Sequence, residues 1–135
     1  MQRVMLKSKI HRATLTATDL HYQGSISIDK NLLEAADILP GEQVHVLNVN
    51  NGNRLVTYTI EAPAGSGTMM LNGPAARCGM PGDIVVVITY AIFDDLEAWQ
   101  HRPTIVLVDG ANRIITHVPP KAPIISPSSS FASIG

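Results

Sequence analysis

Gly24-Ser25 is the residue pair with the most distinctive chemistry in this chain, and it lies in the run DLHYQGS at residues 19–25. A serine hydroxyl can attack the carbonyl carbon of the preceding residue and turn the peptide bond into an ester. Elimination and hydrolysis then leave a new chain that begins with a ketone, an electrophile that no ordinary side chain supplies. The same dipeptide occurs at Gly65-Ser66, and Gly-Ser is common in loops, so the surrounding residues must distinguish the two.

Other motifs for catalysis or binding are not found in the sequence. The five histidines, at 11, 21, 45, 101 and 117, have no metal-type spacing with one another or with Cys78, so we predict no metal site. There is no Walker-type loop, no dinucleotide-binding glycine motif and no Gly-x-Ser-x-Gly elbow. A Ser-His-Asp enzyme could be assembled from the residues present, but any protein of this size supplies those residue types.

The composition indicates one compact domain that acts on a small molecule. The chain has 135 residues and 45% hydrophobic content, which is enough for a single core. A net charge of -1 provides no field for binding nucleic acid or an anionic membrane, and no apolar run approaches the roughly 20 residues that span a bilayer. The single cysteine excludes an intramolecular disulfide, and no apolar segment follows Met1 as in a signal peptide. We therefore expect a cytoplasmic protein.

The elements that must position Gly24-Ser25 are mostly strands, because Val, Ile and Thr are frequent. Asn51-Gly52 predicts a tight hairpin turn between strands at 44–46 and 55–60. A short helix is expected over residues 28–36, with Asp29 as its N-cap and Pro40-Gly41 ending the segment. The other expected elements are extended chain over 3–22, a strand at 68–71, a turn or helix at 73–78, a strand at 83–93, a helix at 94–100, and a strand pair at 103–108 and 113–118.

Two features bear on the organisation of the chain. Residues 119–135 are rich in Pro and Ser and are expected to form a disordered tail, which leaves residues 1–118 as the folded domain. Residues 40–46 (PGEQVHV) are similar to residues 81–87 (PGDIVVV). This repeat suits two interleaved halves of a small closed barrel, but it is equally well explained as ordinary turn-to-strand chemistry.

Four separated motifs occur in the order and spacing of one known family. They are KIHR at residues 9–12, DLHYQGSISID at 19–29, NNGNRLVTY at 50–58 and LNGPAARC at 71–78. Over residues 1–118 the chain closely resembles the pyruvoyl-dependent aspartate decarboxylases. The resemblance implies a double-psi β-barrel, mainly β with a few short helices, that assembles as a homotetramer with active sites between neighbouring subunits.

The resemblance also implies the activity and its cofactor. The chain would cut itself between Gly24 and Ser25 into a β chain of residues 1–24 and an α chain of residues 25–135, with the possible help of a maturation factor. Ser25 would become a pyruvoyl group that forms a Schiff base with L-aspartate, so no metal and no pyridoxal phosphate would be needed. The products would be CO2 and β-alanine for pantothenate and coenzyme A.

The family's functional residues can be carried over position by position. The residues implied in processing are Gly24, Ser25, Thr57 and Asn72. Tyr58 is implied as the proton donor to the substrate's α-carbon. The residues implied in substrate binding are Lys9, Arg54, Thr57, Gly73, Pro74 and Ala75. His11 and Tyr22 are expected in the wall of the site, without an assigned role.

Strand geometry complicates this set. A period of two places Arg54 and Tyr58 on one face of their strand and Thr57 on the other. Thr57 and Tyr58 can then share a pocket only if the strand is locally irregular or two subunits contribute, which favours an oligomer.

The sequence departs from the commonest family pattern at Ile26, Leu47 and Pro74. Pro74 matters most, because proline lacks the backbone N–H that a substrate could use. Two other interpretations remain open at this point. The chain could be a non-catalytic barrel that never cleaves, or a pyruvoyl enzyme that acts on a different amino acid.

Overall fold

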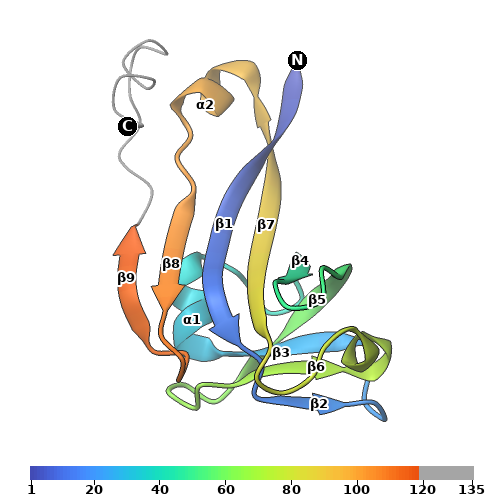
Figure 1. The fold of residues 1–135 in the computed structure, drawn as a ribbon. Coiled ribbons are helices and arrows are strands. Elements are labelled where there is room, and N and C mark those ends of the chain that lie inside the picture. The colour runs from blue at the N-terminus through green and yellow to red at the C-terminus, as the bar shows by residue number, and fades with distance from the viewer. Residues whose placement is uncertain (119–135) are drawn as a thin grey trace.

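The computed structural model describes residues 1–118 and has a mainly β fold with three short helical segments in that range (Figure 1). The strands are β1 (Gln2–Thr14), β2 (Ala17–Asp19), β3 (Ser25–Asp29), β4 (Gln43–Asn48), β5 (Arg54–Ala62), β6 (Met69–Asn72), β7 (Ile84–Asp94), β8 (Thr104–Val108) and β9 (Ile114–Val118). The helices are α1 (Lys30–Ala36), the 3-10 helix η1 (Gly73–Cys78) and α2 (Asp95–Gln100). The strands form one mixed sheet in the order β2-β6-β3-β5-β4-β7-β1-β8-β9.

The sheet closes into a barrel because β1 and β2 are two parts of one bent stretch of chain. β1 pairs antiparallel with β7, and β2 pairs in parallel with β6. At the bend, the N–H of Leu15 donates to the carbonyl of Asp83 at 2.8 Å, and the N–H of Thr16 donates to the carbonyl of Met69 at 2.9 Å. At this bend the chain leaves its partner β7 and joins its partner β6. The closed ring therefore consists of β1/β2, β6, β3, β5, β4 and β7, and β8 and β9 extend the sheet outside it. The predicted small β-barrel is confirmed.

The two repeated Pro-Gly segments occupy matching places in this barrel. Each follows a helix and opens a strand, β4 or β7, and these two strands pair antiparallel with each other. The N–H of Gly41 donates to the carbonyl of Thr59, and the N–H of Gly82 donates to the carbonyl of Leu15, both at 2.8 Å. Thr59 and Leu15 each return a hydrogen bond to the next residue of the loop, at 3.1 and 2.8 Å. The matching hydrogen bonds favour an internal repeat over ordinary turn chemistry.

Aliphatic side chains fill the barrel and hold the strands in register. α1 packs against β1, β3 and β8 and buries Leu32, Leu33 and Ala36. The other large side chains that are almost fully buried are Ile10, Leu15, Ile26, Ile28, Met69, Leu71, Val44, Val46, Val85 and Val87. Ile26 and Leu71 lie opposite each other on β3 and β6, so the core fixes the two strands that carry Ser25 and Asn72.

Most predicted elements are confirmed, but two boundaries are wrong. Residues 25–29 form β3, which pairs with β5 and β6, and the helix begins only at Lys30. Asp29 is the helix N-cap, as predicted, and accepts a hydrogen bond from the N–H of Asn31 at 2.8 Å. The extended chain expected over residues 3–22 is interrupted after Thr14 and ends at Asp19, because the closure of the barrel requires a bend there.

The predicted disordered tail, residues 119–135, lies outside the residues that the structure describes. Among residues 1–118, the helices are all too short and insufficiently apolar to cross a membrane.

Candidate active site

Ser25 is fully buried at the start of β3, directly after an exposed segment at residues 20–23. Its Oγ donates to the carbonyl of Gln23 at 2.9 Å and accepts a hydrogen bond from Nδ2 of Asn72 at 3.0 Å. The same Nδ2 donates to Oγ of Ser27 at 2.9 Å. The antiparallel pairing of β3 with β6 sets Ser25 opposite Asn72. Sheet register therefore brings two predicted processing residues into contact.

Asn72 is fully buried, and its side chain is only partly hydrogen-bonded. Nδ2 donates twice, whereas Oδ1 is buried without a partner among residues 1–118. Leaving a buried acceptor unpaired costs roughly 1–3 kcal/mol, so such an atom in a folded protein calls for an explanation such as a catalytic role. Oδ1 of Asn72 is therefore free to accept from a group that forms or binds beside Ser25.

Gly73 allows the segment before Ser25 to approach the start of η1 very closely. Its φ is 63°, in the left-handed region that favours glycine. A Cβ added at Gly73 would lie 2.7 Å from both the backbone nitrogen of Gly24 and the carbonyl oxygen of Tyr22. No other residue fits there unless the backbone moves. Gly73 thus fixes the position of the Gly24-Ser25 bond.

A pocket of about 450 Å³ opens beside this bond. Its volume falls within the range of small-molecule sites. The residues that line it are Gly24, Leu55, Val56, Thr57, Tyr58, Pro74, Ala75 and Cys78. The pocket therefore brings together predicted residues from three of the four sequence motifs.

Thr57 and Tyr58 share the pocket because it lies at the edge of their strand. Thr57 is opposite Val44, which faces the barrel interior, and Tyr58 points to the other face of β5. β3 pairs in parallel with β5 only from Ile26, which lies opposite Thr59. The residues of β5 before Thr59 therefore have no β3 partner along this edge. Continued backwards, the same register sets Gly24 level with Thr57. A single chain can therefore place both side chains at the pocket, which removes one argument for an oligomer.

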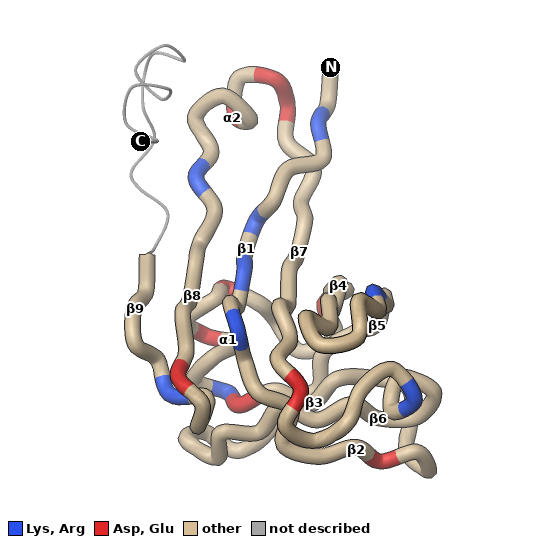
Figure 2. Tube along the Cα trace, viewed as in Figure 1, with Lys and Arg blue, Asp and Glu red and all other residues tan. Residues whose placement is uncertain are grey.

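Lys9 and Arg54 do not line the pocket of their own chain. Lys9 lies on β1 between the buried residues Ser8 and Ile10, so its side chain points to the outer face. Nη1 of Arg54 lies 3.3 Å from Nδ1 of His45. Figure 2 shows positively charged positions distributed along β1. Within one chain, Arg54 thus directly precedes the lining residue Leu55 without lining the pocket, and Lys9 lies on β1, which supplies none of the lining residues.

The two residues expected in the wall of the site are also absent from the pocket lining. His11 is half-buried on β1, and burial, followed by the nearby charges of Lys9 and Arg12, lowers its pKa below the usual value of 6.5. Tyr22 is 52% exposed, and its backbone carbonyl oxygen lies close to Gly73.

The second Gly-Ser pair has quite different surroundings. The N–H groups of Gly65 and Gly67 donate to the carboxylate of Asp29 at 3.0 and 2.8 Å. Oγ of Ser66 is exposed and lies 2.8 Å from Oγ1 of Thr68. These contacts hold Ser66 in a surface loop, and the expectation that this loop stays intact remains a prediction.

Sequence reasoning missed three residues of the pocket, namely Leu55, Val56 and Cys78. Residues three apart eclipse each other in a 3-10 helix, so Ala75 and Cys78 share a face of η1. The three-residue spacing from Ala75 could therefore have predicted Cys78 as a residue of the pocket. Leu55 and Val56 carried no signal, because only the late start of the β3 pairing exposes this edge of β5.

For the predicted cut between Gly24 and Ser25, replacing Asn72 by alanine should slow cleavage about ten-fold, because one hydrogen bond to Oγ of Ser25 is lost from a buried site. A time course of denaturing mass spectra measures the uncut fraction. Ser27→Ala is the matched control, since it removes the other acceptor of the same Nδ2 and leaves the Ser25 contact in place. Equal slowing in both variants would contradict a specific role for the Asn72–Ser25 contact.

The closed barrel, the buried serine and the adjoining pocket define a small β-barrel enzyme. Comparisons with known proteins specify its family. Residues 1–115 match the family model described as aspartate decarboxylase. The aspartate 1-decarboxylases of Heliobacterium modesticaldum, Pelotomaculum thermopropionicum and Maricaulis maris are 57%, 60% and 56% identical to this chain. These alignments cover 85%, 82% and 85% of this chain and 87%, 84% and 95% of those proteins. The chain therefore belongs to the aspartate decarboxylase family.

Proposed function

We propose that this chain cuts itself between Gly24 and Ser25, converts Ser25 into a pyruvoyl group, and then decarboxylates L-aspartate to β-alanine and CO2. The observation that carries the proposal is the contact of Ser25 Oγ with Asn72 Nδ2, at 3.0 Å, in a buried position beside the pocket. The relatives named above support the choice of aspartate. The β-alanine would serve the synthesis of pantothenate.

The processing step begins when Oγ of Ser25 bonds to the carbonyl carbon of Gly24. The C–N bond then breaks, and the nitrogen takes up a proton to give an ester. Thr57 is level with Gly24 along β5 and can donate a hydrogen bond to the oxyanion that forms at the Gly24 carbonyl. Elimination then removes the Cα proton of Ser25, breaks the Cβ–Oγ bond and releases the carboxylate of Gly24, which leaves a dehydroalanine. This enamine tautomerises to an imine, and water hydrolyses the C=N bond to give the ketone and ammonia.

The residues around Ser25 fit the ketone that this step leaves. The position is fully buried, borders the pocket through Gly24, and adjoins Oδ1 of Asn72, which has no partner within the described chain. A pyruvoyl group supplies a carbonyl that condenses with a primary amine and withdraws electrons from the bond that is to be broken.

The pocket residues would bind the substrate and hold its proton. Tyr58 lines the pocket with a partly exposed ring, so its hydroxyl can reach a small ligand and return a proton to the α-carbon. Thr57 and the backbone of Ala75 would add polar contacts from the lining, and Gly73, which is buried outside the lining and directly precedes Pro74, would contribute through its backbone. Pro74 contributes only its ring and its carbonyl, because it has no N–H.

Lys9 and Arg54 would bind the substrate carboxylates from a neighbouring copy of the chain. This assignment rests on their charge and on their positions away from the pocket of their own chain. It is the reason to propose a homotetramer with active sites between subunits. The cytoplasmic location, the absence of metal and pyridoxal phosphate, and a maturation factor remain predictions.

Denaturing mass spectrometry and CO2 release together test the proposal. After incubation, the denatured protein should give two masses, one for residues 1–24 and one for residues 25–135 with a pyruvoyl group in place of Ser25. CO2 should be released from L-aspartate much faster than from L-glutamate. A single uncut species would instead support the non-catalytic barrel, and a preference for another amino acid would identify a different pyruvoyl enzyme.

Tyr58→Phe is expected to leave cleavage intact but to lower kcat by at least about 100-fold, because general acid catalysis typically contributes that much. Mass spectra give the cleaved fraction, and CO2 release gives the rate per cleaved chain. Tyr90→Phe is a matched control, since Tyr90 has a similar exposure, 39% against 37%, and packs against His45 outside the pocket. Full activity in Tyr58→Phe would refute the assignment of Tyr58 as proton donor.

A further inference from the structure

Three asparagine side chains from one turn converge on a single carbonyl oxygen. Nδ2 of Asn48, Asn51 and Asn53 lie 3.2, 3.0 and 3.4 Å from the carbonyl oxygen of Cys78. We call these three residues the asparagine clamp. A carbonyl oxygen has two lone pairs, so these three donors fully occupy its capacity to accept hydrogen bonds.

The asparagine clamp joins the two walls of the pocket. One wall is the first part of β5, residues 55–58, which directly follows the turn that carries the clamp. The other wall is η1, with Pro74, Ala75 and Cys78. The clamp holds the last residue of η1 at the start of β5, so it sets how far apart the two walls stand.

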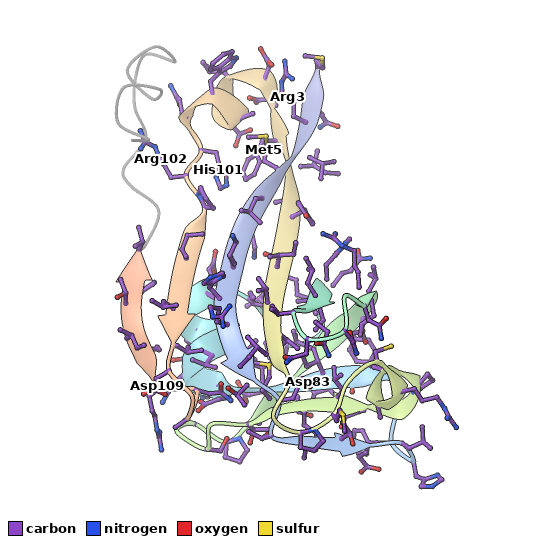
Figure 3. The ribbon with its side chains drawn as sticks, in the orientation of Figure 1. Arg3, Met5, Asp83, His101, Arg102 and Asp109 are labelled. Atoms are coloured by element: carbon purple, nitrogen blue, oxygen red, sulfur yellow. The ribbon has the colours of Figure 1, made fainter. Side chains whose placement is uncertain are left out.

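Asn48 anchors the clamp to the barrel, whereas Asn51 and Asn53 lie in the exposed turn. Asn48 is 4% exposed, and its Nδ2 also donates to Oδ2 of Asp83 at 2.9 Å. Figure 3 labels Asp83 at the lower end of β7. The hydrogen bond from Asn48, followed by that from the N–H of Met80, lowers the pKa of Asp83, which keeps the carboxylate ionised as an acceptor. Oδ1 of Asn48 accepts from the N–H of Asn50 and that of Asn51 at 2.8 and 3.3 Å.

We propose that Asn51 and Asn53, held by Asn48, are positioning residues that set the width of the pocket and thereby the affinity for the substrate. The proposal rests on the proposed function, because it assigns the substrate to this pocket. Asn51 and Asn53 touch the carbonyl of Cys78 and act through η1.

The clamp is separate from the contacts that govern cleavage. Ser25 is held by the carbonyl of Gln23 and by Asn72, and Gly24 is held by its close approach to Gly73. These contacts belong to β3, β6 and the first residue of η1, whereas the clamp holds the last residue of η1. Loss of the clamp should therefore change substrate binding and leave the rate of self-cleavage within about two-fold.

The test uses the full-length double variant Asn51→Ala/Asn53→Ala, which adds no charge that could repel an acidic substrate. The variant loses both hydrogen bonds to the Cys78 carbonyl, together with the one from the N–H of Asn53 to Oδ1 of Asn51 at 2.8 Å within the turn. Loss of the two bonds to Cys78 should raise KM for L-aspartate about five- to ten-fold and leave kcat per cleaved chain within about two-fold. Asn50→Ala is the matched control. Asn50 lies in the same turn, but its Oδ1 accepts from the N–H of Ile84 at 2.7 Å and not from η1. Asn50→Ala should keep the KM of the unmodified chain.

A second measurement does not depend on catalysis. Cys78 is the only cysteine in the chain and lines the pocket, so its labelling rate with iodoacetamide reports on the position of the η1 wall. Release of the clamp should raise this rate about five-fold, and Asn50→Ala should not change it. Unchanged labelling and KM in the double variant would overturn the proposal, as would equal changes in the control. If no variant decarboxylates aspartate, the proposed function fails, and the labelling rates still decide whether the clamp sets the pocket.

Discussion

Ser25→Ala is expected to yield a single uncut chain of 14.5 kDa and to release no CO2 from L-aspartate. In the proposed reaction Oγ of Ser25 attacks the Gly24 carbonyl and later leaves as part of the Gly24 carboxylate, so that Cα of Ser25 can become the ketone carbon, and alanine has no oxygen for either step. Alanine differs from serine by a single oxygen, and Nδ2 of Asn72 keeps Oγ of Ser27 as an acceptor, so we expect the variant to keep the fold. Denaturing mass spectra after prolonged incubation and a CO2 assay measure the two losses.

Ser66→Ala is the control for this prediction, because it alters the other Gly-Ser pair of the same chain. Oγ of Ser66 lies 2.8 Å from Oγ1 of Thr68, and within residues 1–118 no asparagine side chain contacts it as Asn72 contacts Ser25. This variant should cleave and turn over normally. Fragments that end at residue 65, or normal activity in Ser25→Ala, would show that the wrong serine has been assigned.

Gly73→Ala is expected to slow cleavage by about 100-fold without a change in the chemistry of Ser25. A Cβ at this position would lie 2.7 Å from the backbone of Gly24 and of Tyr22, and the φ of 63° adds strain for any residue except glycine. The backbone must therefore move, and a displacement of about 1 Å at a reacting group can cost about 100-fold in rate. The cleaved fraction against time is the measurement.

Gly110→Ala is a control for the general effect of adding a methyl group to a glycine. A Cβ at Gly110 would meet no atom within 4 Å among the residues described. This variant should cleave at the normal rate and keep the normal unfolding temperature. Normal cleavage in Gly73→Ala would mean that the approach of Gly24 to η1 has no part in processing.

The sequence predicted those parts of the fold that depend on local chemistry. Asn51-Gly52 predicted the hairpin between β4 and β5, where Gly52 has a φ of 78° in the region that favours glycine, and Asp29 predicted the helix N-cap through its short acceptor side chain. The strand at residues 25–29 was missed because its two partners, β5 and β6, come later in the chain. Pairing between distant strands leaves little trace in any one segment.

The candidate site shows the same division. The residue types around Gly24-Ser25 were predicted from the sequence; the structure places Asn72 in contact with Ser25, and the roles of both residues stay predictions. Period two predicted correctly that Thr57 and Tyr58 face opposite ways, but it could not show that the pocket lies at a strand edge, where both can line it. The sequence also could not show that Lys9 lies outside the lining of the pocket, since this depends on the order of strands in the barrel.

The bend that joins β1 to β2 has a thermodynamic consequence for the proposed cut. Both strands precede residue 24. Cleavage at Gly24-Ser25 would therefore leave β1 and β2 without a covalent link to the other strands of the barrel. Pairing of β1 with β7 and β8, and of β2 with β6, would then hold the fragment in place. Folding of the intact chain is unimolecular, whereas reassembly of the cut protein would be a binding reaction between two polypeptides and would depend on their concentration. The mature barrel would thus be a complex of two fragments that was folded while still one chain.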